Sequence, residues 1–297
     1  MMGRGRRYLV QTEGLPLSLK CMANGRARYV VERNEFAVDD HGWLIVNEDQ
    51  PYTIEISSPT ELETFIVWFP RGWAEEVWRS ATTPAAQLLA EPHNLSARAG
   101  FFERYTPNEN AVAPLVHELR RVAKSGEPLE DAWLEQRLRE LLARMLGVQR
   151  DLRAAIARLP AMRAETREEL WRRLNRARDF IHARCDSDLT IADAADVAAM
   201  SPFHFLRAFG TAFGTSPHGW LTACRVERAK YFLARTELSV TEVCFATGYG
   251  SLGSFSTWFH RLTGRSPRAW RREHGLRQQI RNIREVSTAP VPLNSPT

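Results

Sequence analysis

Cysteine is scarce in this chain of 297 residues, and the four that occur are widely separated. No two of them form a C-x-x-C pair, which argues against a zinc site and against a disulfide framework. We therefore expect buried free thiols and no bound metal or other cofactor. The four are Cys21, Cys185, Cys224 and Cys244.

Long apolar runs are also missing. No segment has the length and hydrophobicity of a transmembrane helix, and the basic start from Met1 to Arg7 lacks the apolar stretch of a signal peptide. The composition, 44% hydrophobic and 25% charged, is that of a globular protein long enough for two domains. We expect a cytoplasmic protein that does not bind a membrane.

Positive charge is unevenly distributed. From Trp171 to Arg284 the chain has eighteen Lys and Arg against nine Asp and Glu, whereas the remainder is mildly acidic. A basic half beside an acidic one is typical of a nucleic-acid-binding domain attached to another domain, although a solvated arginine-rich surface has the same composition.

The first part of the chain predicts strands and the next part predicts helices. Short apolar runs separated by turn signals indicate a small barrel or sandwich, whereas apolar residues at three- and four-residue spacing indicate amphipathic helices. The predicted strands cover residues 27–31, 36–38, 43–46, 52–56 and 62–69, with a turn at Ser57-Ser58-Pro59. The predicted helices cover residues 111–124, 129–146 and 148–159, and the chain then stays helical from Glu165 to about Arg272.

A repeated pattern in the helical part carries the functional argument. Residues 201–220 align with residues 251–270 at an offset of fifty, matching a serine, two phenylalanines, a Gly-x-Ser-Pro motif and a tryptophan. Upstream, Thr190 aligns with Ser239 at an offset of forty-nine, because Gly250 is one extra residue. Two copies of one structural unit are therefore predicted, at about 189–213 and 238–262.

Each copy has the pattern of a helix-turn-helix unit. A hydroxyl residue caps a short helix, small residues permit a tight turn, and Ser201 or Ser251 caps a second helix. Two phenylalanines one turn apart bury that second helix and leave its N-terminal side chains exposed, as in helices that enter the DNA major groove. Between the copies, residues 217–235 predict a helix of about 28 Å, which suits reading helices about one DNA turn, or 34 Å, apart. A helical repeat without a ligand is the alternative.

Residues from about Leu174 to Arg272 resemble the DNA-binding domain of the AraC/XylS family of bacterial transcription regulators. The resemblance rests on Ser201-Pro202-Phe203-His204-Phe205, Arg225-Val226 and Gly248-Tyr249-x-Ser251, together with both Gly-x-Ser-Pro motifs. It implies base contacts from Phe203, His204, Leu206 and Arg207 in the first copy and from Leu252, Gly253, Ser256 and Thr257 in the second. Phosphate contacts are expected from Thr190, Ser201, Ser239, Ser251, Ser254, His260 and Arg261. The resemblance also implies binding to double-stranded promoter DNA and activation through RNA polymerase.

Two departures from the family pattern concern the turn and the second reading helix. Ala199 stands where the family usually has glycine, and no Arg, Lys, Asn or Gln occurs from Leu252 to Thr257. Since Arg207 can contact guanine with two hydrogen bonds, we expect the first copy to specify sequence more strongly than the second.

The N-terminal part, Gly25 to Phe69, resembles the cupin-like barrel of sensor domains in the same family. A barrel of this size can hold a small-molecule effector, and Trp43, Tyr52 and Trp68 are candidate pocket residues, although aromatic residues in strands are more often plain core. A cupin-type enzyme would need clustered histidines, and His41 stands alone here, so we expect no enzymatic activity. A module that binds another protein, or a constitutive DNA binder, is the alternative to effector sensing.

The expected organisation has a cupin-like β domain at residues 1–83, a helical linker at 84–164, an all-α DNA-binding domain at 165–275 and a disordered tail at 276–297. The linker helices have one apolar side, which either packs on their own barrel or joins two chains in a homodimer. We favour the homodimer, because two readers then bind paired half-sites.

Overall fold

The computed structural model describes residues 2–84, 101, 104–108, 110–157 and 164–275. The predicted tail at 276–297 and the predicted end of a helix at Leu159 lie outside these residues. Within them no helix is both long and apolar enough to cross a membrane.

The chain divides into two compact units. The first unit contains residues 1–183 and 192–215, and the second contains residues 184–191 and 216–297. The helical segment that follows residue 164 is therefore shared between the units.

In the described part of the first unit, seven strands form one sheet in the order β4-β3-β6-β2-β5-β7, and β1 pairs with the other edge of β6. All the pairings are antiparallel. The path of hydrogen bonds through these strands stays open, so the barrel closure expected from the sequence is not found among them. The strands are β1 (Met2–Thr12), β2 (Ser18–Ala23), β3 (Arg26–Val31), β4 (Asn34–Asp39), β5 (Gly42–Val46), β6 (Tyr52–Trp68) and β7 (Tyr105–Pro107).

Strand β6 is longer than predicted and pairs with three other strands of the sheet. The turn predicted at Ser57-Ser58-Pro59 is wrong, because β6 runs through it as one strand of 17 residues. One edge of β6 pairs with β1, and the other pairs first with β3 and then with β2. Pairing with β1 at residues 52–57 and 62–65, on both sides of these residues, holds the strand extended where the isolated residues favour a turn. Strands β1, β2 and β7 were not predicted.

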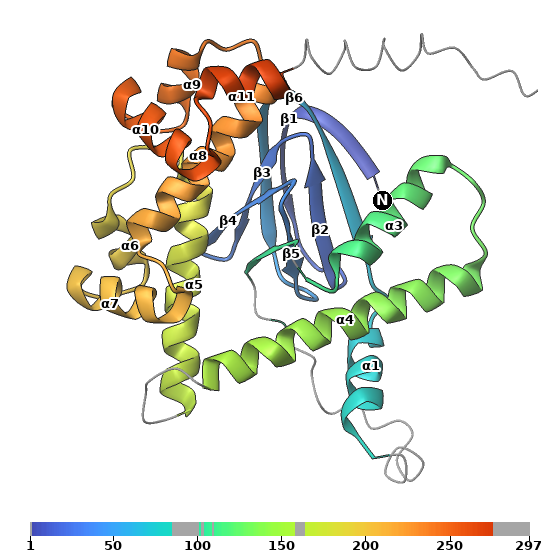
Figure 1. The fold of residues 1–297 in the computed structure, drawn as a ribbon. Coiled ribbons are helices and arrows are strands. Elements are labelled where there is room, and N and C mark those ends of the chain that lie inside the picture. The colour runs from blue at the N-terminus through green and yellow to red at the C-terminus, as the bar shows by residue number, and fades with distance from the viewer. Residues whose placement is uncertain (1, 85–100, 102–103, 109, 158–163, 276–297) are drawn as a thin grey trace, which may run out of the picture. The chain divides into compact units, whose positions relative to one another are not determined.

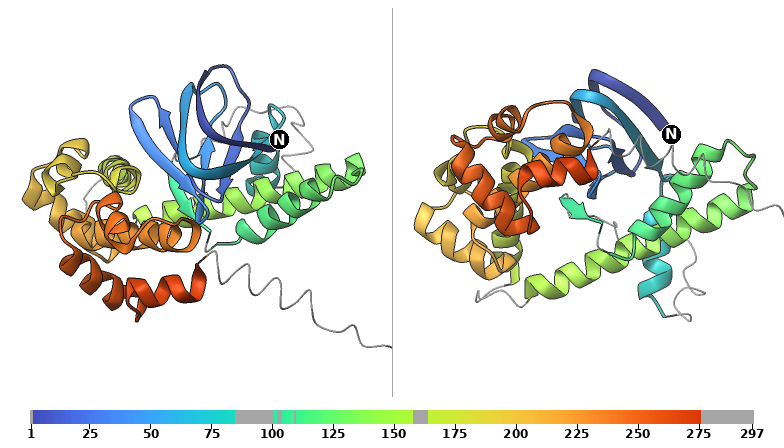
Figure 2. Two further views of the ribbon diagram at one scale, coloured as in Figure 1. Left: turned by 90° about the horizontal axis from the view of Figure 1, so that it is seen from above. Right: turned by 45° about the horizontal axis from the view of Figure 1, so that its top comes forward.

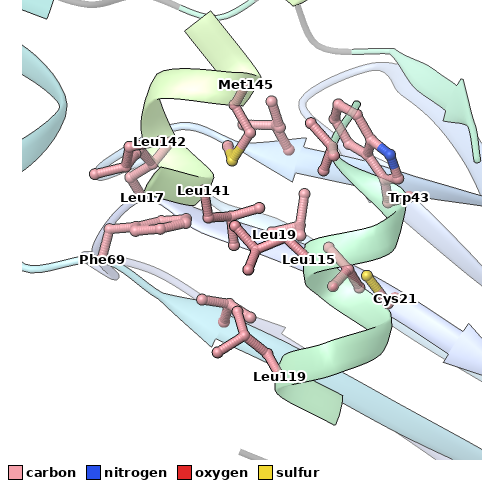
Figure 3. Close-up of a cluster of buried hydrophobic side chains, with 14 of the residues drawn as sticks. Leu17, Leu19, Cys21, Trp43, Phe69, Leu115, Leu119, Leu141, Leu142 and Met145 are labelled. Atoms are coloured by element: carbon pink, nitrogen blue, oxygen red, sulfur yellow. The ribbon is translucent and has the colours of Figure 1, made fainter. Parts of the chain in front are cut away.

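One face of the sheet is covered by α1 (Trp73–Thr82), α3 (Ala113–Ser125) and α4 (Asp131–Ala157). Figures 1 and 2 show α3 lying beside α4 along the sheet. The prediction of two separate helices at 129–146 and 148–159 is wrong, since α4 continues through Gly147. Packing compensates for the glycine, because Leu141, Leu142 and Met145 are fully buried against the sheet (Figure 3). The apolar side of this helix thus packs within its own chain.

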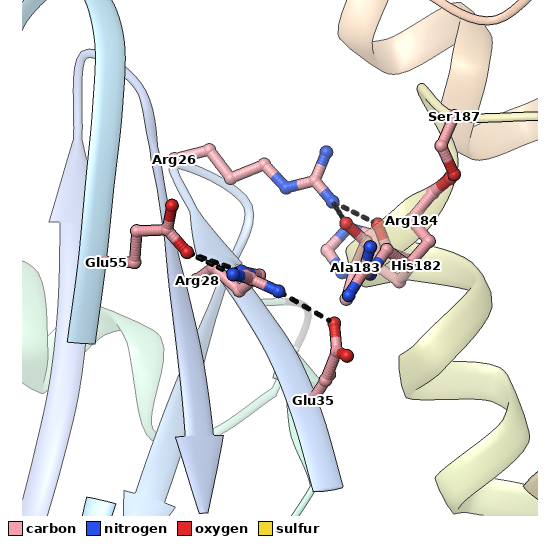
Figure 4. A network of polar contacts seen from close by, with 8 residues as sticks. All are labelled: Arg26, Arg28, Glu35, Glu55, His182, Ala183, Arg184 and Ser187. Carbon is pink, nitrogen blue, oxygen red and sulfur yellow. Dashed lines mark hydrogen bonds and ion pairs between the residues drawn. The ribbon is translucent and has the colours of Figure 1, made fainter. Parts of the chain in front are cut away.

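The strands also hold helix α5 (Ala164–Arg184). Arg26 of β3 donates hydrogen bonds to the backbone carbonyls of His182 and, at 2.6 Å, Ala183 at the C-terminal end of that helix (Figure 4). His182 Nε2 lies 3.3 Å from the Asp39 carboxylate, which also accepts a 2.8 Å hydrogen bond from the Tyr105 hydroxyl. Burial raises the pKa of Asp39, but the bonds from His182 and Tyr105 outweigh it and leave that pKa below its usual value.

A buried ion pair lies one turn earlier in the same helix. The Arg178 guanidinium donates to the Asp179 carboxylate at 2.7 Å and to the Tyr105 carbonyl at 2.9 Å. Asp179 in turn accepts a 3.2 Å bond from the Tyr105 backbone N–H. Both charges are buried, so the short strand β7 completes a site in which neither charge is left unpaired.

The remaining helices of the first unit are α6 (Ile191–Val197) and α7 (Pro202–Phe213), and Phe213 packs against Trp171 of α5 with ring centroids 5.4 Å apart. The second unit holds α8 (Pro217–Arg235), α9 (Val240–Ala246), α10 (Leu252–Thr263) and α11 (Pro267–His274). The bounds predicted for α8 are confirmed. In the core of the second unit, Val226, Phe232 and Leu233 of α8 pack with Phe255 and Phe259 of α10.

Candidate nucleic-acid interface

The repeat found in the sequence is also a repeat of backbone geometry. Helices α6 and α9 have seven residues each, and α7 and α10 have twelve. Their turns use equivalent hydrogen bonds, since Ala199 N–H donates to the Asp196 carbonyl at 2.8 Å and Gly248 N–H donates to the Phe245 carbonyl at 3.0 Å. The first helix pair, α6 and α7, and the second helix pair, α9 and α10, therefore have the same turn geometry between their two helices.

The two turns have the same left-handed backbone conformation, with alanine in the first and glycine in the second. Gly248 has φ of +80° and Ala199 has φ of +51°, so both lie in the left-handed region. A Cβ at Gly248 would lie 3.0 Å from the Cys185 carbonyl oxygen and 3.0 Å from Arg225 Nη2. The second turn requires glycine for space as well as for φ, whereas the first accepts alanine.

Serine hydroxyls cap both second helices. Ser201 Oγ accepts from His204 N–H at 3.4 Å, and Ser251 Oγ accepts from the Ser254 N–H at 3.3 Å. Ser239 begins α9 with a reciprocal bond to Glu242, a capping box. These three serines, which we predicted as phosphate contacts, therefore also fix the helix ends whose N–H groups attract anions.

The exposed face of α7 carries every base-contacting residue predicted for the first copy. Phe205 and Phe209 are fully buried, as the spacing predicted. Phe203 is 78% exposed and Leu206 is 44% exposed, and at a spacing of three residues the two lie on the same side of the helix. His204 and Arg207 are exposed on the same helix.

At the positions predicted to contact bases, α10 carries less hydrogen-bonding capacity than α7. Leu252, Gly253 and Thr257 are exposed, whereas Ser256 is half-buried. Two cationic candidates, His260 and Arg261, are exposed further along the helix, and the Arg261 guanidinium lies 5.0 Å from the centre of the Trp258 ring. The structure thus places seven of the eight predicted base-contacting residues on exposed helix surface and leaves Ser256 partly covered.

Sequence reasoning missed the structural role of Arg225. Its Nε donates to the Cys185 carbonyl at 2.7 Å and its Nη2 donates to the Ser187 carbonyl at 3.1 Å, while the guanidinium lies over the Tyr249 ring. This side chain ties the turn between α9 and α10 to the segment that precedes α6. The signal for this role was the place of Arg225 in the residues that carry the family resemblance.

Further exposed residues of the second unit were also missed. Phe245 of α9 is 58% exposed, and Arg268 and Arg272 are exposed on α11. The Pro-Arg-Ala-Trp-Arg-Arg stretch signals such a basic helix, because its arginines at three- and four-residue spacing share one side.

The three effector candidates of the N-terminal part do not lie together. Trp43 is fully buried in the cluster between the sheet and its helices (Figure 3). Tyr52 and Trp68 flank Lys20, whose ammonium group lies 4.4 Å and 4.0 Å from the centres of their rings. Side chains alternate along a strand, so Lys20 points away from the face that carries Leu19 and Cys21. The structure brings Tyr52 and Trp68 together around a lysine that we did not predict.

Comparison with known proteins agrees with the helix pairs. Residues 194–273 match a family model described as a helix-turn-helix domain. The transcriptional activator NphR of Rhodococcus is 37% identical over 89 residues, which cover 30% of this chain and 26% of NphR. The C-terminal helices form an AraC-type helix-turn-helix domain.

A further curated relative and a solved structure are similar to part of this chain. The Bacillus subtilis regulator YobQ, an uncharacterised helix-turn-helix protein, is 33% identical over 92 residues, or 31% of this chain and 38% of YobQ. A solved regulator from Chromobacterium violaceum with an AraC-type DNA-binding domain is 25% identical, with a TM-score of 0.33, and the match covers 35% of this chain and 93% of that one. The chain therefore spans about a quarter of the length of NphR and about two fifths of that of YobQ.

Proposed function

We propose that this chain is a cytoplasmic transcription regulator that reads promoter DNA with both helix pairs as tandem helix-turn-helix units. The observation that carries the proposal is the repeated backbone of the AraC-type domain, with capped reading helices whose exposed faces have no folding role. Reading helices α7 and α10 enter successive major grooves on one side of the DNA. The name of NphR, a transcriptional activator, supports activation, and we propose that this chain activates through contact with RNA polymerase.

The two reading helices contribute unequally to sequence recognition. Arg207 pairs with the edge of a guanine, and Phe203 and Leu206 contact apolar base edges such as the thymine methyl group. On α10 the groups able to specify a base are the Thr257 and Ser256 hydroxyls and the Leu252 side chain. Its neighbours, including Ser254, His260 and Arg261, hold the DNA backbone and thereby set register. In the first copy, Thr190 has the same task.

We extend the proposal to the N-terminal part as an effector-sensing, cupin-like domain. Its support is the set of contacts from β3, β4 and β7 to helix α5, because these hold the helix that leads into α6. A ligand that moves these strands changes the position of α5 and so the presentation of α7. A homodimer is part of the same proposal, because it lets two readers bind paired half-sites. Trp133, Leu134 and Leu138 of α4 pack partly on the core of their own chain, so only their outer edges would face a partner.

Selection of genomic fragments by the purified full-length protein tests the proposal. Recovered DNA should share two half-elements about one helical turn apart, and affinity should fall steeply as salt rises. Arg207→Ala should weaken the preference at one base position. The matched control is Arg150→Ala, which removes an exposed arginine of α4 whose side chain is 78% exposed.

Recovery of fragments with no shared sequence, by the wild type and by both variants alike, would reject the proposed reader. A single half-element that is lost with Arg207→Ala would restrict sequence reading to the first pair.

A further inference from the structure

Lys20 is an unusual residue for the middle of a sheet. The chain has three lysines, and this one has no exposed surface at all. Within the part of the chain that the structure describes, its ammonium group makes one hydrogen bond, at 2.8 Å to the Tyr52 hydroxyl, and no carboxylate pairs with it. Burial lowers the pKa of Lys20 to about 7.

Two further polar groups on this face lack a hydrogen-bond partner among the described residues. They are the Ser18 Oγ and the Tyr29 hydroxyl, which are 1% and 0% exposed as residues. Ser18 lies two positions from Lys20 on the same side of β2, and the Tyr29 ring lies 5.8 Å from the Tyr52 ring. Buried polar groups are usually hydrogen-bonded, so both hydroxyls can accept a bond from, or donate one to, a bound ligand or water.

The chemistry of these groups identifies the missing partner. An ammonium group has three N–H donors and no acceptor, and each hydroxyl can donate one more bond. Hydroxyl oxygens can also accept bonds, but they carry no charge. A negatively charged group with several acceptor lone pairs is therefore the partner that matches the ammonium group and can also accept from the hydroxyls. The surroundings are apolar, since Leu44 and Val46 pair across from Lys20 and Ser18.

We propose that Lys20 is the anion-binding residue of an effector site in the N-terminal domain, and that the effector is a small monocarboxylic acid with an apolar body. The inference rests on the proposed function in so far as it calls the ligand an effector. Tyr52 and Trp68 hold the ammonium group between their rings, and Tyr29 and Ser18 supply further donors to the carboxylate. A methionine of similar length would suit the apolar surroundings without any charge to desolvate, so folding alone does not explain the lysine.

Binding of a carboxylate is then coupled to protonation of the Lys20 amine. A lysine that titrates near pH 7 is partly neutral in the free protein, and the bound anion favours its charged form. The ligand therefore raises the pKa of Lys20, and affinity falls as the pH rises above 7.

Because the chain has three lysines, the titration of each one can be followed by NMR in the full-length protein. Incorporation of lysine labelled with ¹³C at Cε gives one signal each for Lys20, Lys124 and Lys230, and Lys20→Met assigns the first. The probes are benzoate, phenylacetate and hexanoate, each compared with its uncharged amide. At least one carboxylate should move the Lys20 signal and raise its titration midpoint, while its amide should not and the other lysine signals should stay in place.

Variants separate binding from folding. Lys20→Met should weaken the responding carboxylate at least tenfold and leave the chain folded, and Tyr29→Phe should weaken it less. The matched control, Lys230→Met, removes a lysine whose partner is Glu227 at 2.8 Å on the surface of α8, and should bind as the wild type does. Affinity of the wild type should drop about tenfold from pH 7 to pH 8.5.

The inference is overturned if no carboxylate moves the Lys20 signal more than its amide does, or if Lys20→Met binds as tightly as the wild type. Its failure is distinct from failure of the proposed function. Selection of a DNA motif by a protein that ignores all three carboxylates would reject the anion site alone, whereas carboxylate binding by a protein that selects no DNA would reject the reader alone.

Discussion

The two helix pairs share a backbone and differ in almost every exposed side chain. Helices α7 and α10 have the same length, the same serine cap and the same two buried phenylalanines. Their outer faces carry Phe203 and Arg207 in one case and Leu252 and Thr257 in the other. The difference teaches that the buried residues determine where a reading helix lies, and the exposed ones determine what it can read.

The largest expected effect tests whether the two scaffolds are equivalent. Phe209→Ala and Phe259→Ala should each destabilise their own helix pair by about 3–5 kcal/mol, because each removes a fully buried ring. Urea unfolding combined with hydrogen exchange in α7 and α10 measures the two losses. Phe203→Ala, at an exposed position, should cost less than about 0.5 kcal/mol. Unequal losses of unfolding free energy would show that the two phenylalanines do not stabilise their helix pairs equally.

The turns should respond in opposite ways. Gly248→Ala forces a side chain into a left-handed conformation and against the Cys185 carbonyl, so it should destabilise the second pair by about 1–3 kcal/mol. Ala199→Gly relieves a strained φ and should change stability by less than about 1 kcal/mol. Chemical denaturation of both variants gives the two values. A tolerated Gly248→Ala would show that Arg225 and the carbonyl can move aside.

The reading faces should differ in DNA binding and leave folding unchanged. Arg207→Ala should lose about 1–3 kcal/mol of discrimination at one base pair, the usual value of a two-bond contact to guanine. Thr257→Ala should lose less, since a single hydroxyl makes one bond. Competition binding to oligonucleotides that vary one position at a time measures both. Equal losses would contradict the expected division between the pairs.

The smallest expected effect concerns the cap of the second pair. Hydrogen bonds from Ser239 hold the pKa of Glu242 below its usual value. A carboxyl group with a lowered pKa in the folded protein adds stability above its unfolded pKa and loses it as the pH falls through the folded value. Glu242→Gln keeps a capping amide without the charge, so it should remove a slight loss of thermal stability on acidification. Melting temperatures of wild type and variant along a pH series from 6 to 3 test this, and parallel curves would contradict it.

Local signals in the sequence predicted the helix pairs well. Serine caps, glycine stops and phenylalanines one turn apart act within a dozen residues, so the repeat and the bounds of α8 could be derived without tertiary structure. The same signals placed Phe205 and Phe255 in the core and Phe203 on the surface, as the structure confirms.

The sheet depended on contacts that are distant in the sequence. Strand β1 pairs along β6, which lies some fifty residues away in the sequence. The composition of either strand alone does not predict which strand it pairs with. The same long-range pairing keeps β6 extended through Pro59, and packing keeps α4 helical through Gly147. The Lys20 site was missed for the same reason, because a lysine between two apolar residues shows its burial only when β5 and β6 flank it.

The buried phenylalanine pair also determines how this protein can change. Since α7 is held by Phe205, Phe209 and Phe213 and by its Ser201 cap, the exposed positions 203, 204, 206 and 207 should accept other helix-forming residues. Under the proposed function, preference for one half-site can change while the other half-site keeps the protein on its DNA. Two copies of one scaffold with divided tasks would then give the protein a gradual mutational route to new target sequences, because the changing side chains lie outside the core.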